Sequence, residues 1–208
     1  MKLDIAAPVI TSHHYYALPL AVICSEAGLK RWIYSEFVQW HTYRDREDER
    51  TRVSLYMDRN ERYVYGPLHE TVVMPKQLAG GKDVASVFKG LLDDGQYIYD
   101  FVDHYYIRSL KWDRHAMHDV LIYGYDDSLQ VFHIYAYNGT KLAEVDVPYA
   151  EYEEAYDSDY QRGQFHCTVL YRKKDAEFHP DIRRIGDHLL DYLDGVDTYD
   201  RESPRLVP

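Results

Sequence analysis

The stretch Trp112–Gly139, WDRHAMHDVLIYGYDDSLQVFHIYAYNG, predicts two β-strands joined by a tight turn. Aromatic and β-branched residues favour strands over 118–125 and 129–137, and the Asp-Asp-Ser run after the first strand is typical of a turn. Asn138-Gly139 signals a second turn, because both residues accept a positive φ. A third strand is expected over 140–147, so this region should form an antiparallel meander.

The pairing of the first two strands determines what lies near His118. Pairing centred on Asp127 puts His118 opposite Ala136, and a centre half a residue later puts it opposite Tyr137. Directly opposed residues on neighbouring strands are close enough to interact. In either register, a histidine at the start of one strand faces the end of the next.

Helical patterns come first along the chain, and strands dominate afterwards. Apolar residues recur at helical spacing over 12–28, where Ser12 is a preferred N-cap and Gly28 a plausible stop, and over 32–43. The remaining patterns predict helices over 83–92, 148–157 and 181–194, and strands over 53–57, 62–65, 96–107 and 165–171. This order indicates an α+β fold in one domain, 1–195, followed by a tail, 196–208. The last four residues of the tail resemble the start of an engineered protease-site linker.

The charge and hydropathy of the chain exclude several classes of protein. Its 208 residues carry 24 basic and 35 acidic side chains, a formal net charge of −11, which disfavours nucleic acid and anionic membranes as partners. The first residues lack the basic and apolar segments of a signal peptide, so none is expected, and no apolar run approaches the roughly 20 residues of a membrane helix. These features predict a cytoplasmic protein.

Neither the cysteines nor most of the histidines predict a reactive centre. Cys24 falls in the apolar stripe of a helix and Cys167 on the apolar face of a strand, so both are interpreted as core residues. Eleven histidines are present, but the close groups, His13-His14 and His115 with His118, lack the spacing of a helical zinc motif. We therefore expect no metal site and no cofactor.

Ser12 and His118 are the candidates for catalysis. A serine at a helix N-terminus lies beside free backbone N–H groups, which stabilise a developing negative charge. Serine also needs a base within hydrogen-bond reach, and His118 at the mouth of the sheet meets that need. In the structural alternative, Ser12 only caps its helix and His118 only bonds a backbone carbonyl.

Several local patterns resemble the N-terminal domain of the butirosin-biosynthesis acyltransferase family, which is itself similar to papain-like cysteine peptidases. The order and spacing of these patterns, rather than any single one, carry the resemblance over roughly residues 9–195. They are HDVLIYGYD at 118–126, VFHIYAYNG at 131–139, VPYAEYEEAY at 147–156, GQYIYD at 95–100, DHYY at 103–106 and LDYL at 190–193.

The resemblance implies a papain-like fold, with an N-terminal helical lobe packed on an antiparallel β-sheet lobe. In that fold a cysteine at a helix N-terminus meets a histidine that is oriented by an aspartate one strand later. The histidine position matches His118. The cysteine position falls on or beside Ser12, with His13 at the rim of the cleft, and the acid position falls at Tyr137 or Ala136. Two of the three catalytic positions therefore differ, and Tyr137 is expected to orient His118 through its hydroxyl.

The resemblance also implies a function in bacterial natural-product assembly, either of nonribosomal peptides or of polyketides. An acyl or peptidyl group would move from a carrier-protein thioester to an amine or to water, so the implied partners are an acyl or peptidyl carrier protein and a small-molecule amine or peptide. The alternative is a catalytically inactive binding module that uses the same cleft. The missing cysteine and acid favour the binding module, whereas His118 and Ser12 favour the enzyme.

Overall fold

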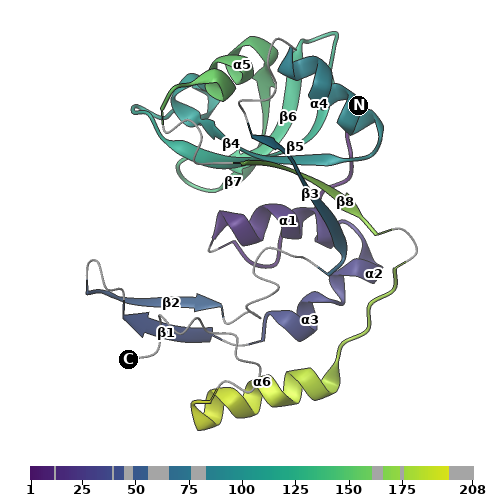
Figure 1. Cartoon of the computed structure of the whole chain (residues 1–208), viewed down its shortest axis with the longest axis vertical. Coiled ribbons are helices and arrows are strands. Elements are labelled where there is room, and N and C mark those ends of the chain that lie inside the picture. The colour runs from purple at the N-terminus through teal and green to yellow at the C-terminus, as the bar shows by residue number, and fades with distance from the viewer. Residues whose placement is uncertain are drawn as a thin grey trace. The chain divides into compact units, whose positions relative to one another are not determined.

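The computed structural model describes residues 1–11, 13–38, 40–44, 49–55, 66–75, 83–160, 166–173 and 176–196. The chain forms two compact units (Figure 1). Unit 1 comprises Met1–Ser25 and Leu68–Arg172, and unit 2 comprises Glu26–Pro67 and Lys173–Pro208. Among the described helices, none combines the length and the apolar character that crossing a membrane requires.

Unit 1 is built on a six-stranded antiparallel sheet with the strand order β3-β8-β4-β5-β6-β7. The consecutive strands β4 to β7 form the meander that the central sequence predicts. The strands are β3 Leu68–Pro75, β4 Tyr97–Asp103, β5 Met117–Asp126, β6 Val131–Tyr137, β7 Leu142–Pro148 and β8 His166–Arg172. The predicted α+β class with an antiparallel sheet is thereby confirmed.

Helices cover both faces of this sheet (Figure 1). Helices α4 (Val84–Asp93) and α5 (Tyr149–Asp157) lie on one face, where Tyr152 packs edge to face against both Phe88 and Phe132. Helix α1 (His14–Cys24) lies on the other face and contacts β5, β6 and β8. Two short 3-10 helices, His104–Tyr106 and Arg108–Leu110, lead from β4 toward β5.

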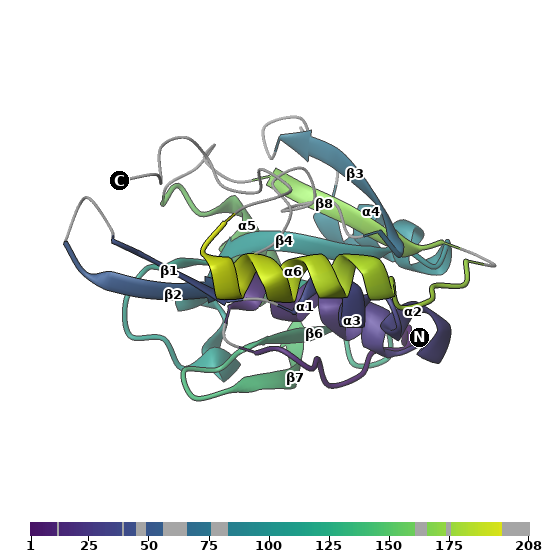
Figure 2. The ribbon, with the colours of Figure 1, turned by 90° about the horizontal axis from the view of Figure 1, so that it is seen from below.

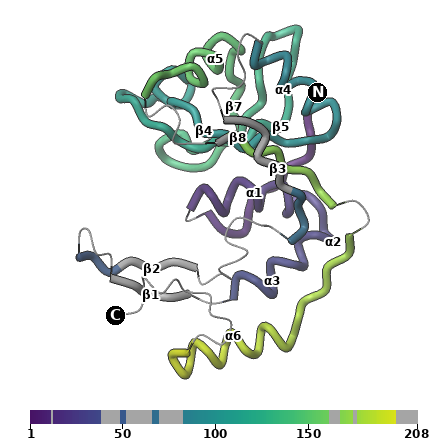
Figure 3. The backbone as a smooth tube through the Cα atoms, viewed as in Figure 1, coloured from purple at the N-terminus to yellow at the C-terminus, as the bar shows by residue number. Residues whose placement is uncertain are grey.

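Helix α1 departs from the prediction at both ends. It begins at His14, with His13 in the N-cap position, and ends at Cys24, where the Ser25 hydroxyl donates to the Val22 carbonyl. Gly28 does not stop it, because Gly28 lacks the positive φ of a terminating glycine and lies inside the next helix, α2 (Ala27–Lys30). The helix continues through Pro19, and its trace in Figure 3 is uninterrupted.

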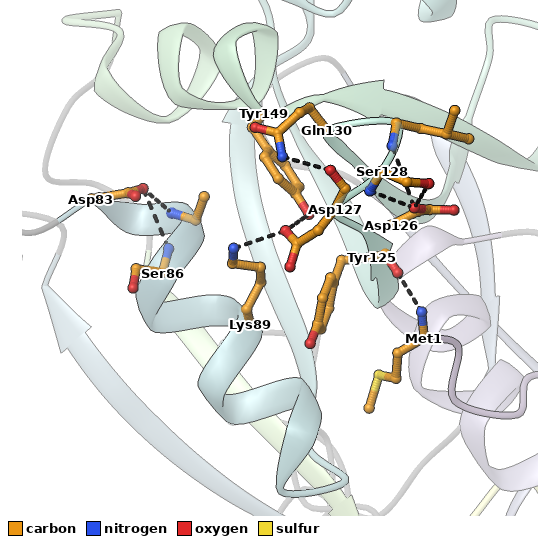
Figure 4. Close-up of polar contacts among 12 residues, drawn as sticks. Met1, Asp83, Ser86, Lys89, Tyr125, Asp126, Asp127, Ser128, Gln130 and Tyr149 are labelled. Atoms are coloured by element: carbon orange, nitrogen blue, oxygen red, sulfur yellow. Dashed lines mark hydrogen bonds and ion pairs between the residues drawn. The ribbon is translucent and has the colours of Figure 1, made fainter.

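The turn between β5 and β6 is held by two aspartates (Figure 4). Asp126 Oδ1 accepts hydrogen bonds from the amide and the hydroxyl of Ser128, at 2.8 and 2.6 Å. Asp127 Oδ1 accepts from Lys89 Nζ at 2.9 Å and from the Tyr149 hydroxyl at 3.0 Å, which ties the turn to α4 and α5.

This turn is longer than predicted, so the expected partners of His118 are wrong. Strand β6 begins at Val131 rather than 129, and a bulge shifts the register between Ile122 and Gly124. As a result Val120, not His118, lies opposite Ala136. On its other side, His118 pairs with Val102 of β4.

Unit 2 contains the other described elements: α2, α3 (Ile33–Glu36), the antiparallel pair β1 (Trp40–Arg44) and β2 (Thr51–Leu55), and α6 (Ile182–Asp194). Helix α6 is a single straight helix in Figure 2, capped by the Asp181 side chain and ended by Gly195 at φ +66°. An ion pair of 2.7 Å between Arg184 and Glu36 joins α6 to α3.

The structure tests the remaining element predictions. The helices predicted over 83–92, 148–157 and 181–194 are confirmed. The helix predicted over 32–43 is wrong beyond Glu36, because the aromatic and Thr-containing segment Trp40–Arg44 pairs with β2 as a strand instead. The strand predicted over 62–65 and the first residue of the strand predicted over 165–171 lie outside the described residues.

The grouping of the elements also differs from the expected division into a helical lobe and a sheet lobe. Helix α1 belongs to the same unit as the six-stranded sheet, because its continuous buried run Tyr16–Ile23 packs on β5, β6 and β8. Unit 2 contains a two-stranded sheet of its own. The candidate site described below lies entirely within unit 1.

Candidate functional site

Three side chains from two elements of unit 1 meet in what we call the histidine–aspartate cluster: His14, His118 and Asp119. His14 is the first residue of α1, and the other two lie near the start of β5. The Nδ1 atom of His118 is 2.6 Å from Asp119 Oδ1. The Nδ1 atom of His14 is 3.4 Å from His118 Nδ1 and 3.4 Å from the same carboxylate oxygen.

Asp119 is a buried carboxylate that remains ionised. Its side chain is 6 % exposed, and its second oxygen, Oδ2, accepts a hydrogen bond of 3.1 Å from the Tyr99 hydroxyl. Burial by itself would raise the pKa of Asp119, but the contacts with His118 and His14 outweigh it and hold that pKa well below its usual range. The cluster therefore keeps a negative charge beside two imidazoles at neutral pH.

Two contacts at His118 Nδ1 bear on which ring nitrogen carries the proton. A carboxylate only accepts hydrogen bonds, so an oxygen 2.6 Å away favours a proton on Nδ1. The backbone amide of Asp119 donates to the same Nδ1 at 2.9 Å, which favours a lone pair there, but the charge of the ionised carboxylate makes the first arrangement the stronger one. The Nε2 atom of a neutral His118 is then left with a lone pair, as a general base requires.

Aromatic rings surround the cluster. The His104 ring stacks on the His118 ring with 5.0 Å between centroids, and Trp112 lies 5.6 Å from the same ring. The Tyr137 ring lies 4.8 Å from His14 and 6.4 Å from His118. Trp112 and Tyr137 also line a hollow of about 460 Å³, together with Leu110, Lys111, Asp113, Arg114 and Gly139. Trp112 and Tyr137 therefore lie between the cluster and this hollow.

His104 differs from the other aromatic residues around the cluster. It has no exposed surface, and within the described part of the chain neither of its ring nitrogens has a hydrogen-bond partner. Burial lowers the pKa of His104 to about 3, with a further contribution from His118. His104 is therefore a neutral imidazole in contact with the cluster.

The structure brings two of the four predicted site residues, His118 and Tyr137, into this region. The hydroxyl of Tyr137 donates to the Gly139 carbonyl at 2.9 Å, so the expectation that it orients His118 is wrong. His13 lies in the N-cap position of α1, and its ring stacks on Tyr15 at 5.2 Å. Burial, followed by the neighbouring His14, lowers the pKa of His13. Ser12 lies outside the described residues.

The cysteines agree with their predicted structural role in part. Cys167 is buried, 4 % exposed, in the core between the sheet, α4 and α5. Cys24 is half-buried at the last position of α1. Neither belongs to the histidine–aspartate cluster.

Sequence reasoning missed three residues of this site, His14, His104 and Asp119. Neighbouring residues on a strand normally point to opposite faces, so Asp119 was not expected beside His118. His14 was missed because Ser12 was predicted as the N-cap of α1, one residue before the observed N-cap, His13. The adjacent pair His118-Asp119 was the available signal, since Nδ1 is the ring nitrogen nearest the backbone and reaches the next side chain.

Comparisons with known proteins add little to this geometry. No protein-family model matches the sequence, and no curated protein matches it. Among solved structures, the chain is similar to one described as a "putative C39-like peptidase from Bacillus anthracis", with 14 % identity and a TM-score of 0.33. The match covers 58 % of this chain. It covers 62 % of the peptidase chain, which is less than two thirds of that chain's length. A similarity this low carries no argument, so the site rests on its own contacts.

Proposed function

We propose that unit 1 carries an acyl-transfer site in which His118 is the general base and Asp119 orients it. The observation that carries this proposal is the 2.6 Å contact between His118 Nδ1 and the buried, ionised Asp119. Asp119 takes the role that the sequence resemblance gives to an acid one strand later. The proposed nucleophile is Ser12, which comes two residues before the start of α1 in the sequence. The first residue of α1, His14, contacts His118 of β5.

The proposed reaction begins with proton transfer from the Ser12 hydroxyl to His118 Nε2. The serine oxygen attacks the carbonyl of an acyl or peptidyl thioester, the C–S bond breaks, and the proton passes from Nε2 to the departing thiolate. An amine or water then loses a proton to Nε2 and attacks the acyl-serine ester, which releases the product and returns the proton to Ser12. Asp119 stabilises each transient imidazolium because its carboxylate stays charged.

The proposed substrates follow from the resemblance to the butirosin-biosynthesis family and not from the geometry. A carrier-protein thioester would supply the acyl or peptidyl group, and a small amine or peptide would accept it. The hollow beside Trp112 and Tyr137, about 460 Å³, offers space for the acyl portion. A papain-like arrangement of α1 and β5 belongs to the same proposal, and the contact of 3.4 Å between His14 and His118 supports it.

A second candidate function is a catalytically inactive binding module. One observation favours it: the nearest group to His118 from α1 is the His14 imidazole, which is not a nucleophile of acyl transfer in this arrangement. In that case the aromatic rings around the cluster would bind a ligand without catalysing a reaction.

Turnover of simple acyl thioesters with an amine acceptor tests the proposal. We expect the wild-type chain to release thiol above the background rate, and Ser12→Ala and His118→Ala each to abolish that release. His179→Ala is the control, because this histidine is 70 % exposed and belongs to unit 2. Equal background rates in the wild type and both site variants would overturn the enzyme proposal and leave the binding module.

A further inference from the structure

We propose that His14, His118 and Asp119 form a binding site for one divalent transition-metal ion such as Zn²⁺. The ligand atoms are His14 Nδ1, His118 Nδ1 and a carboxylate oxygen of Asp119, which all lie within 4.8 Å of one another. Nothing in the spacing of the histidines along the sequence indicates this site, because its ligands come from α1 and β5.

The chemistry of the three groups suits such an ion. Neutral imidazole nitrogens and carboxylate oxygens are the common ligands of zinc, and three protein ligands leave a fourth position for water or substrate. The Asp119 carboxylate would offset part of the charge of the ion. The side chains of His14 and His118 are 19 % and 26 % exposed, so both imidazoles reach the surface.

The distances also fit tetrahedral coordination. Bonds of about 2.0–2.1 Å place the ligand atoms of a tetrahedral zinc ion roughly 3.3–3.4 Å apart. The separations of His14 Nδ1 from His118 Nδ1 and from Asp119 Oδ1 are both 3.4 Å. Only His118 Nδ1 and Asp119 Oδ1, 2.6 Å apart, must separate further, by about 0.8 Å.

Two neighbouring residues supply the outer contacts that metal sites normally have. The Tyr99 hydroxyl holds Asp119 Oδ2, which leaves Oδ1 directed at the two histidines. His104 is the independent observation: a fully buried imidazole stacked on His118, with both ring nitrogens lacking a partner among the described residues. Water bound to the ion would give this imidazole the hydrogen bond it lacks.

A bound ion would change the chemistry of His118, and this consequence rests on the proposed function. Coordination uses the lone pair of Nδ1, so the single proton of the neutral ring moves to Nε2. A protonated Nε2 does not accept a proton from a nucleophile. Metal binding and general-base catalysis at His118 are therefore mutually exclusive.

Calorimetric titration of the whole chain with ZnCl₂, after treatment with a chelator, tests the site. We expect saturable binding of one Zn²⁺ per chain. His14→Ala and Asp119→Ala should each weaken it at least about 100-fold, since loss of an outer contact alone weakens metal sites 10- to 100-fold. His13→Ala is the matched control: the same residue type one position away, with its ring on Tyr15 instead of His118, should bind as the wild type does.

A second variant keeps the test independent of folding. His104→Phe preserves an aromatic ring in the buried position and removes only the ring nitrogens, and we expect it to weaken Zn²⁺ binding about tenfold. Circular dichroism shows whether each variant is folded. The absence of saturable binding by the wild type, or wild-type binding by both folded ligand variants, would overturn the site. Because the titration contains no acyl substrate, its failure is distinct from a failure of the proposed acyl transfer.

Discussion

Two histidine–carboxylate pairs of unit 1 have a buried carboxylate and almost the same length, and they differ in what else holds that carboxylate. Asp103 lies 2.7 Å from His115 Nδ1, and Asp119 lies 2.6 Å from His118 Nδ1. Both carboxylates are buried, and both have a lowered pKa although burial acts to raise it. The distance between histidine and carboxylate therefore does not distinguish the pairs.

The other contacts of Asp103 fix the backbone. Its Oδ1 accepts from the amides of Tyr105 and Ala116, and its Oδ2 accepts from the Ser158 hydroxyl at 2.8 Å. Asp103 thereby joins the start of the 3-10 helix, the segment before β5 and the end of α5. We interpret this pair as structural, because every acceptor position is occupied by the protein itself.

The other contacts of Asp119 come from side chains alone. Its oxygens contact His118, His14 and the Tyr99 hydroxyl, and no backbone amide is bound to its carboxylate among the described contacts. Side chains rearrange without unfolding the backbone, so this pair can exchange a proton or admit an ion. The comparison teaches that the partners of the carboxylate, rather than the pair itself, indicate a functional site.

The largest expected difference between the pairs is in turnover. Asp119→Asn should lower the acyl-transfer rate by about 10⁴-fold, because an amide neither stabilises the imidazolium nor holds the required tautomer. His115→Ala removes one member of the other pair and should leave turnover unchanged. Steady-state thiol release by both folded variants measures the difference, and an equal loss in the two would contradict the distinction.

The next difference is in the free energy of unfolding, for which we expect Asp103 to contribute more than Asp119. Asp103→Ala should lower the free energy of unfolding by about 3 kcal/mol, because two backbone amides and a hydroxyl lose their buried acceptor. Asp119→Ala should lower it by about 1 kcal/mol, since only side chains lose a partner. Urea unfolding followed by circular dichroism compares the two, and equal losses would mean that both carboxylates are structural.

Zn²⁺ should bind at the His118–Asp119 pair and not at the His115–Asp103 pair. We expect Zn²⁺ to suppress acyl transfer by the wild type, with a midpoint equal to its calorimetric Kd. In His14→Ala, relative to the metal-free rate of the same variant, that midpoint should rise at least about 100-fold. Suppression with the same midpoint in both proteins would place the inhibiting ion elsewhere.

The smallest expected effect concerns the Tyr99 hydroxyl, which donates a hydrogen bond to Asp119 Oδ2. Tyr99→Phe removes the hydroxyl that orients Asp119 and should weaken Zn²⁺ binding about tenfold. Tyr105→Phe is a suitable control, because that ring packs on His115 beside the structural pair. Calorimetry measures both, and equal Kd values would show that Tyr99 does not position the carboxylate.

The sequence predicted the scaffold of this site better than its chemistry. The meander and the three capped or Pro-led helices after residue 83 follow from local patterns, so their prediction succeeded. The register of β5 and β6 depends on a bulge and a four-residue connection, 127–130, which strand propensity does not reveal. That error put Ala136 or Tyr137 opposite His118, where the resemblance also placed the orienting group, whereas the observed partner is the next residue along the chain.

The start of α1 was the second source of error. Ser12 has the stronger capping preference, but the helix begins at His14, and this placement brings an imidazole against β5. His104 was not predicted either, because it became significant only through burial and the absence of a hydrogen-bond partner within the described residues. Burial of this kind depends on tertiary packing and cannot be predicted from residue spacing.

The central claim is that His118 presents a free Nε2 because Asp119 holds its Nδ1–H. Long-range ¹H–¹⁵N correlation spectra of the ¹⁵N-labelled protein, with His118→Gln used to assign the signal, report which nitrogen of this ring is protonated. We predict the Nδ1–H tautomer at neutral pH, and a change to the Nε2–H tautomer when one equivalent of Zn²⁺ is added. An Nε2–H tautomer in the metal-free protein would mean that Nδ1 accepts from the Asp119 amide instead, and it would contradict the assignment of His118 as the base.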